Sequence, residues 1–379
     1  MGETKKKLHF MDYLLDGIFF LFLLLITFLL YLNESSCIKT KKTLHEAEGA
    51  LVKVNDVSAV DKALNGKLIY ASAFADTKEV LTDGLYNVSE TALYLRRRVE
   101  YYQYTEKSRR RNKKTTYYYE REWNPSPISS KGFHSSSHRN FVLVNIEQQS
   151  VCANEARFGG YRLPKFLISS IGGGDPAPVK VSSDELRQWE KVITDNLMAL
   201  GKNVPEGVSM VHVGSNEVYY GRSPSEPAIG DVRVRFTKIP PLQLSLIAKV
   251  SGDTFDKYTT ETGQTFTAVK RGTVSAESMF SSAHTTNTAD AWFFRVILLV
   301  LLIVAWRAMY NVLPDFFKSS AFLDSLRNAG INVFQIVMGC VWACLVVAVV
   351  WLQYRPIVSV ALLSCIIAGI IFLRNKAKR

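Results

Sequence analysis

"LLDGIFFLFLLLITFLLYL", Leu14–Leu32, is the stretch that decides the class of fold. It is apolar almost throughout, with Asp16 near its start as the one charged residue. A helix needs about 20 predominantly apolar residues to cross the hydrocarbon core of a bilayer. Lys5–Lys7 upstream resembles the start of a signal peptide, but the run is long and Asn33-Glu34 follows it instead of a small-x-small cleavage site. We therefore expect a membrane-spanning helix here.

Three further apolar runs lie near the carboxyl end of the chain, at 291–312, 331–352 and 356–373. Each is about as long as a membrane span. The region between the first and second runs is polar and holds short alternating segments typical of strands. The sequence therefore predicts an α+β membrane protein, with four transmembrane helices and a large β-rich domain between the first and second.

The orientation follows from the positive charges that flank the spans, because an excess of Lys and Arg in short loops indicates the cytosolic side. The tails and the loop after the second span carry nine such residues, against four close to a span on the opposite side. Both termini are therefore expected in the cytosol and the β-rich domain in the lumen. The expected segments are a cytosolic tail (1–13), span one (14–32), a lumenal β-rich domain (33–290), span two (291–312), a cytosolic amphipathic loop (313–330), span three (331–352), span four (356–373) and a cytosolic tail (374–379).

The most distinctive stretch of the β-rich domain is "VEYYQYTEKSRRRNKKTTYYYEREW", Val99–Trp123. Both halves alternate with period two and are rich in Tyr and Thr, which predicts an antiparallel hairpin with cross-strand aromatic pairs and a solvated basic tip. Interleaved aromatic and basic residues also suit a nucleic-acid surface or a contact with anionic lipid head groups. A lumenal domain does not meet nucleic acid, so we expect a protein contact. The residues expected to form it are Tyr102, Tyr104, Arg109, Arg110, Arg111, Lys113, Lys114 and Tyr118.

Other strands and one helix are expected in the same domain. Ser182–Glu185 has the spacing of a capping box, and four apolar residues then recur at helical spacing before Gly201. Thr40–Leu51 is expected to continue the first span as a helix. The remaining expected strands are Lys67–Ala73, Phe141–Glu147, Ser209–Val213, Asp231–Phe236, Leu242–Val250 and Thr265–Lys270.

The last two spans carry stripes of small residues that match in depth on either side of the short link 353–355. Small residues let helices approach closely in a bilayer, so these stripes are expected to face each other. The residues expected to make this contact are Cys344, Ala348, Ala361 and Cys365. Arg295 and Arg307 lie near the ends of the second span, where long side chains can extend to the interface. Pro314–Gly330 is expected to form a short helix on the cytosolic membrane surface.

The sequence contains no familiar catalytic, nucleotide-binding or metal-binding motif. His134 and His138 stand four apart in a Ser-rich stretch, which suits a surface loop better than a rigid metal site. Asn87 begins the sequon Asn-Val-Ser and is a glycosylation candidate in a lumenal domain. We therefore expect no enzyme, no cofactor and no metal, and the pairing of Cys37 with Cys152 is open.

Several stretches in order resemble a known family: "LNESSCIKTKKTLHEAEG", "LNGKLIYASA", "LYLRRRVEYYQYTE", "YYYEREWNPSPISSKGFHSSSHRN", "IGDVRVRF", "SGDTFDKYTTETGQTFTAVKRGTVSAESMF" and "WLQYRP". Together they resemble the transmembrane protein 43 (LUMA) family over nearly the whole chain. The resemblance implies a protein of the endoplasmic reticulum and inner nuclear membrane, with nuclear-envelope organisation, self-association and binding to lamins and emerin. Phe141 stands where the family pattern has proline, and the hairpin tip is unusually basic.

These observations lead to a non-enzymatic scaffold of the endoplasmic reticulum and nuclear envelope. Its expected partners are the lipid bilayer, membrane or lumenal proteins of the nuclear envelope and further copies of the chain, with no nucleic acid. One alternative is lumenal lipid binding or lipid sensing, with Phe166–Ile171 entering the membrane interface beside Lys165. An enzyme without a recognisable motif and a channel-like oligomer are further alternatives.

Overall fold

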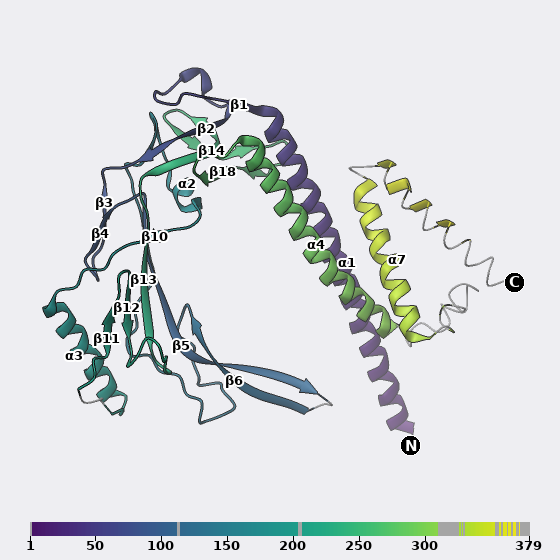
Figure 1. Ribbon diagram of the computed structural model, residues 1–379. Coiled ribbons are helices and arrows are strands. Elements are labelled where there is room, and N and C mark those ends of the chain that lie inside the picture. Colours follow the sequence, from purple (N-terminus) through teal and green to yellow (C-terminus); the bar gives the residue numbers. More distant parts are fainter. Residues whose placement is uncertain are drawn as a thin grey trace. The chain divides into compact units, whose positions relative to one another are not determined.

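The computed structural model describes residues 2–111, 114–203, 207–309 and 330–352, with 326, 328, 356–357, 359–361, 363–364, 367–368 and 371 (Figure 1). These residues divide into two compact units. A helical unit comprises 1–50, 259–266 and 277–379, and a strand-rich unit comprises 51–258 and 267–276. The strand-rich unit therefore lies between the first two long helices in the sequence, as expected.

The helical unit is built on α1 (Gly2–Ala50), α4 (Ala276–Met309) and α7 (Ile331–Leu352). Each contains a stretch long and apolar enough to cross a membrane, so three candidate spans are found among the described residues. α1 continues to Ala50, which confirms the predicted helical extension of the first span. The described residues between 356 and 371 are helical, but the fourth span as a whole lies outside the described part of the chain. The same is true of nearly all of the predicted surface helix 314–330.

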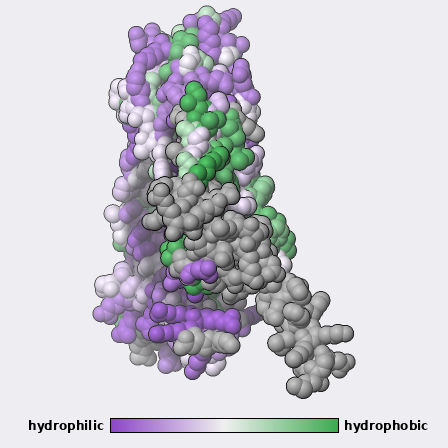
Figure 2. Space-filling view, turned by 90° about the vertical axis from the view of Figure 1, so that its right-hand side faces the viewer, coloured by the Kyte–Doolittle hydropathy of each residue, from purple (hydrophilic) through white to green (hydrophobic). Residues whose placement is uncertain are grey.

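The three helices pack around a shared apolar cluster that includes Leu30, Leu302 and Phe334, all at most 2% exposed. Gly339 allows the close approach of α7 to α4, because a Cβ at this position would lie 2.7 Å from Cγ1 of Ile303. Other apolar side chains of α1 and α4, such as Leu21 and Phe293, point outward and are more than 60% exposed. Figure 2 shows such hydrophobic surface on the helical unit. Outward apolar side chains are what a helix in lipid requires.

The first sheet of the strand-rich unit is built on two long antiparallel strands, β2 (Leu68–Asp76) and β14 (Leu242–Ser251). β1 (Leu51–Lys53) pairs with β2 in parallel, and β18 (Ala268–Arg271) pairs with β14. The pairings β2–β8–β9–β15–β14–β2 form a closed circuit. The short members are β8 (Arg157–Phe158), β9 (Tyr161–Arg162) and β15 (Thr254–Asp256).

The second sheet is organised around β5 (Tyr94–Arg111), whose first half pairs with β13 (Val232–Ile239) and with β7 (Gln149–Cys152). The second half of β5 pairs with β6 (Lys114–Asn124), as the predicted hairpin requires. β11 (Val211–Val213), β12 (Glu217–Tyr220) and β10 (Asp175–Pro176) extend the sheet through β13. Two small sheets hold β3 (Val80–Asp83) with β4 (Val88–Thr91), and β16 (Tyr258–Thr259) with β17 (Thr265–Phe266).

Alternating side chains of the strands fill one continuous core. Val99 and Tyr101 of β5 and Val234 and Phe236 of β13 are at most 2% exposed, while Arg233 points to the other face. α3 (Ser183–Ala199) begins at Ser182 with the predicted capping box and buries its predicted apolar face. A 3₁₀ turn (Lys62–Leu64) and α2 (Lys165–Ser170) complete the unit.

Two sequence expectations are wrong in this unit. Phe141–Glu147 forms no strand, because most of its backbone bonds go to side chains: Asn196 donates to the carbonyl of Leu143 at 2.7 Å, and the Tyr101 hydroxyl donates to that of Ile146 at 2.6 Å. The N–H of Leu143 donates to the carbonyl of Gly230 at 2.9 Å, which lies in a turn. The apolar side chains of α2 do not face a membrane. Leu167 and Ile168 are at most 1% exposed in the protein core, so this segment gives no support to lipid insertion.

Candidate functional site

The β5–β6 hairpin extends beyond the sheet that holds it. β13 pairs with Tyr94–Tyr101, whereas β6 pairs with Tyr101–Arg111, so the outer ten residues of β5 have β6 as their described strand partner. Tyr102 lies opposite Trp123 with ring centroids 5.1 Å apart, which confirms one predicted aromatic pair. The outer tyrosines of β6 instead face Glu106, Lys107 and Ser108 across the ladder.

A loop after β6 covers the hairpin with two histidines. The His134 ring stacks on Tyr117 at 3.5 Å, and the His138 ring stacks on Tyr119 at 4.0 Å and meets the edge of Tyr104 at 4.9 Å. His134 also lies 3.0 Å from the Glu106 carboxylate through its Nδ1. These two histidines therefore pack on different tyrosines of the hairpin.

Glu106 is the polar centre of this packing. Its carboxylate accepts hydrogen bonds from the Tyr119 hydroxyl and, at 2.7 Å, from the backbone N–H of His134. The bond from Tyr119, followed by those from His134, lowers the pKa of Glu106. Burial and the same carboxylate raise the pKa of Tyr119. The ionised carboxylate thus ties the loop to both strands.

The basic end of the hairpin is solvent-exposed. Arg109, Arg110, Arg111 and Lys114 are all exposed, and Lys113 lies outside the described residues. No carboxylate of the described chain forms an ion pair with these three arginines. The predicted tyrosines differ from one another: Tyr118 is 43% exposed, whereas Tyr102 and Tyr104 are half-buried against other rings. Among the residues predicted to contact a partner, the arginines, Lys114 and Tyr118 are therefore the exposed ones.

A buried ion pair joins the helices of the other unit. Glu34 is fully buried, and its carboxylate accepts bonds from Arg295 Nε at 2.5 Å and Nη2 at 2.8 Å, and from Trp351 Nε1 at 3.0 Å. The Arg295 guanidinium thus pairs with Glu34, and its extension to the membrane interface stays a prediction. This contact cannot be read from the sequence, because Glu34 lies in the connection after the first span and its partner is 261 positions away.

A cavity of about 600 Å³ lies beside this ion pair, between α1, α4 and the end of α7. Its wall combines basic groups with the indole rings of Trp292 and Trp351, and Arg295 lies 4.9 Å from the centre of the Trp292 ring. Such a mixture suits an anionic group at the edge of an apolar layer. The residues that line the cavity are Cys37, Ile38, Lys41, Lys42, His45, His284, Asn287, Thr288, Trp292, Arg295 and Trp351.

Beside the cavity, a carboxylate lies between two of its lining residues, His45 and His284. Glu48 Oε2 is 3.4 Å from His45 Nδ1, and Glu48 Oε1 is 3.5 Å from His284 Nε2. Three such ligand atoms within 4.8 Å of one another could hold a metal ion. The sequence signal is the i, i+3 spacing of His45 and Glu48 on a helix, but the third residue is more than 200 positions away in the chain.

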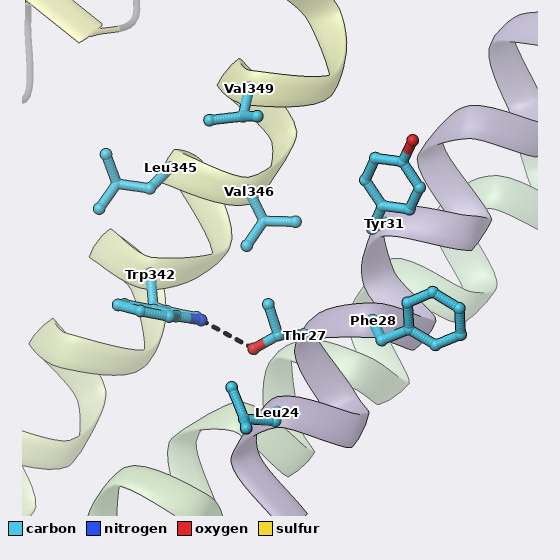
Figure 3. Close-up of a pocket in the computed structure, with 8 residues that line it drawn as sticks. All are labelled: Leu24, Thr27, Phe28, Tyr31, Trp342, Leu345, Val346 and Val349. Carbon is cyan, nitrogen blue, oxygen red and sulfur yellow. Dashed lines mark hydrogen bonds between the residues drawn. The ribbon is translucent and has the colours of Figure 1, made fainter.

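A second cavity, of about 540 Å³, lies between α1 and α7 (Figure 3). Its lining is apolar apart from the tips of a few side chains, and Trp342 Nε1 donates to Thr27 Oγ1 at 2.9 Å across it. It is an apolar groove between two helices of the helical unit. The lining residues are Leu24, Thr27, Phe28, Tyr31, Trp342, Leu345, Val346 and Val349.

The remaining predicted residues are placed as follows. Asn87 is exposed in the turn before β4, with its amide bonded to Glu185. Ala348 is fully buried, whereas Cys344 and Ala361 are exposed, and Cys365 lies outside the described residues. The facing of the last two spans therefore stays a prediction. Cys37 and Cys152 are both free thiols.

The fold defines a multi-pass membrane protein with a strand-rich domain between its first two spans. The family model described as Transmembrane protein 43 matches residues 99–356, so the chain belongs to the transmembrane protein 43 family, as the ordered motifs predicted. Transmembrane protein 43 of Rattus norvegicus is 26% identical over 90% of this chain and 85% of its own length. The Homo sapiens protein is 25% identical over 93% and 88%, and the Drosophila melanogaster homolog 24% over 88% and 87%. No solved structure matches the chain.

Proposed function

We propose that this protein is a non-enzymatic scaffold of the endoplasmic reticulum and inner nuclear membrane, with both termini cytosolic or nucleoplasmic. Its strand-rich domain lies in the lumen and organises the nuclear envelope by binding membrane or lumenal proteins, or further copies of itself. The observation that supports this proposal is the β5–β6 hairpin, which extends past its sheet and ends in arginines that no described carboxylate neutralises.

The hairpin suits recognition of an acidic surface. Exposed guanidinium groups pair bidentately with carboxylates, and they lose little hydration when they do so. The stacking of His134 and His138 on the hairpin tyrosines restrains both strands, so the arginines are held on a preformed support. The cost of ordering the contact is therefore low.

The experiment compares partners recovered by proximity labelling from the lumen. Reversal of three charges, by Arg109→Glu, Arg110→Glu and Arg111→Glu, is expected to remove the partners that the unmodified chain labels. The matched control reverses three exposed lysines on other surfaces of the same domain, Lys62→Glu, Lys67→Glu and Lys191→Glu. An unchanged set of partners in the hairpin variant, or equal loss in the control, would refute the hairpin as the contact.

The orientation is tested on sealed microsomes. We expect a glycan at Asn87 and protection of the strand-rich domain from added protease, while tags on both tails are removed. Digestion of the domain in intact vesicles would contradict the proposed topology.

Lipid binding is the second candidate, and the cavity beside Arg295 favours it. Lys41, Lys42 and two tryptophans border this cavity at the ends of apolar helices, where phospholipid head groups lie. We expect an anionic phospholipid to copurify with the protein, and Lys41→Ala with Lys42→Ala to reduce its amount. Equal lipid content in that variant and in a Lys62→Ala, Lys67→Ala control would exclude this cavity as its site.

A further inference from the structure

We propose that His45, Glu48 and His284 bind a divalent transition-metal ion of the zinc class. Zinc bonds to imidazole nitrogen and carboxylate oxygen are about 2.0–2.2 Å long, so neighbouring ligand atoms around a tetrahedral ion lie roughly 3.4 Å apart. His45 Nδ1 lies 3.4 Å from one Glu48 oxygen and His284 Nε2 lies 3.5 Å from the other, and one ligand atom of each residue lies within 4.8 Å of the other two. One ion fits between the three side chains after small rotations.

The fold holds the three residues in this arrangement through their helices. His45 and Glu48 lie one turn apart on the same face of α1, and His284 lies on α4. Two contacts fix α4 against α1 nearby: the amide of Asn287 donates to the carbonyl of Cys37 at 3.1 Å, and Arg295 pairs with Glu34. The backbone positions of the ligands are therefore set without the metal, so binding has little ordering cost.

The donor set selects the class of ion. Two imidazoles and one carboxylate suit zinc, copper, nickel or cobalt, whereas calcium and magnesium prefer oxygen ligands alone. Three protein ligands also leave a coordination position open. His45 and His284 line the cavity of about 600 Å³, so a water molecule or a small anion in that cavity can take the fourth position.

The charged residues around the site have opposite effects on metal binding. Lys41 and Lys42 border the same cavity and disfavour a cation, while they favour an anionic fourth ligand. Glu46 accepts the backbone N–H of Glu261 at 3.1 Å and points to a different contact. The rival explanation is a pair of hydrogen-bonded histidines that hold Glu48 without any metal. A metal site predicts that the protein binds one equivalent of metal, whereas the metal-free contact predicts no stoichiometric binding.

The test uses the full-length protein in detergent, with its affinity tag removed and bound metal stripped by a chelator. Co²⁺ is titrated first, because its visible absorption reports a tetrahedral site, and Zn²⁺ is then titrated in competition with a chromophoric chelator. We expect one equivalent to bind. Glu48→Gln and His284→Ala should each weaken the affinity at least about tenfold, since each removes one of three ligands.

Two controls separate the metal site from general effects. His134→Ala removes a histidine that also lies beside a glutamate, Glu106, and should leave the affinity unchanged. His45→Cys replaces one zinc ligand by another and should retain binding within about tenfold. Glu48→Gln is nearly isosteric, so it carries the test even where a histidine variant fails to fold. Absence of stoichiometric binding to the unmodified protein, or equal affinity in Glu48→Gln, overturns the proposal.

Discussion

At the scale of single residues, close packing of a loop depends on one glycine. Gly230 has φ of 101°, which favours glycine, and an added Cβ would lie 2.3 Å from Cε2 of Phe141. Lys202 covers the same ring with its ammonium group 4.0 Å from the ring centre. The ring of Phe141 therefore packs directly over the backbone of Gly230.

We expect Gly230→Ala to lower the free energy of unfolding of the strand-rich unit by about 2–4 kcal/mol, from overpacking and from the left-handed backbone together. The measurement is chemical denaturation followed by tryptophan fluorescence. Gly172→Ala is the control, because an added Cβ there meets nothing within 4 Å and the backbone is not left-handed. A stability equal to that of the control would show that Phe141 can move aside at no cost.

At the scale of elements, local pattern predicts those elements whose partners are near in sequence. The hairpin and the capped helix α3 follow from alternation and from Ser182, and both are found. Phe141–Glu147 has the same alternation but no strand, because its backbone bonds go to distant side chains such as Asn196. The predicted insertion of α2 into the membrane interface was wrong for a related reason. Periodicity cannot distinguish a helix that faces the protein core from one that faces a membrane.

The hairpin element gives a prediction on pH. The pKa of Glu106 is lowered in the folded protein, first by the Tyr119 hydroxyl and then by His134. A lowered carboxyl pKa contributes stability above the ordinary pKa of Glu, about 4.3, and this contribution is lost as pH falls through the lower folded value. The unmodified protein should therefore lose more thermal stability between about pH 5 and pH 3 than Glu106→Gln, which has no charge to lose.

The control for that comparison is Glu120→Gln, a change in the same hairpin at a carboxylate that faces Lys107 in solvent. It should follow the unmodified protein closely, because exposed ion pairs contribute about 0–1 kcal/mol. If Glu106→Gln and the unmodified protein destabilise in parallel on acidification, the Tyr119 and His134 bonds do not bind the loop to the hairpin.

At the scale of the whole molecule, composition predicts that the chain spans a membrane but not how its helices recognise one another. The length of the apolar runs is enough to predict α1, α4 and α7 as candidate spans. Their contacts depend on residues such as Gly339 and Glu34, whose partners Ile303 and Arg295 are remote in the sequence. The candidate metal cluster is hidden in the same way, because His284 meets His45 only once α4 lies along α1.

The Glu34–Arg295 pair yields a prediction about how the helical unit holds together. Glu34 also accepts the indole N–H of Trp351, so one carboxylate connects three helices. Removal of one partner of a buried ion pair leaves an uncompensated charge and costs about 3–5 kcal/mol, whereas replacement of both by apolar residues is often neutral.

Arg295→Met and Glu34→Leu should each lower the melting temperature of the detergent-solubilised protein, and the double variant should recover most of the loss. Arg307→Met, at an exposed arginine of the same helix that bonds Asn332, should have little effect. If the loss in the double variant equals the sum of the two single losses, the two side chains contribute independently, and the ion pair between them is not what joins the helices.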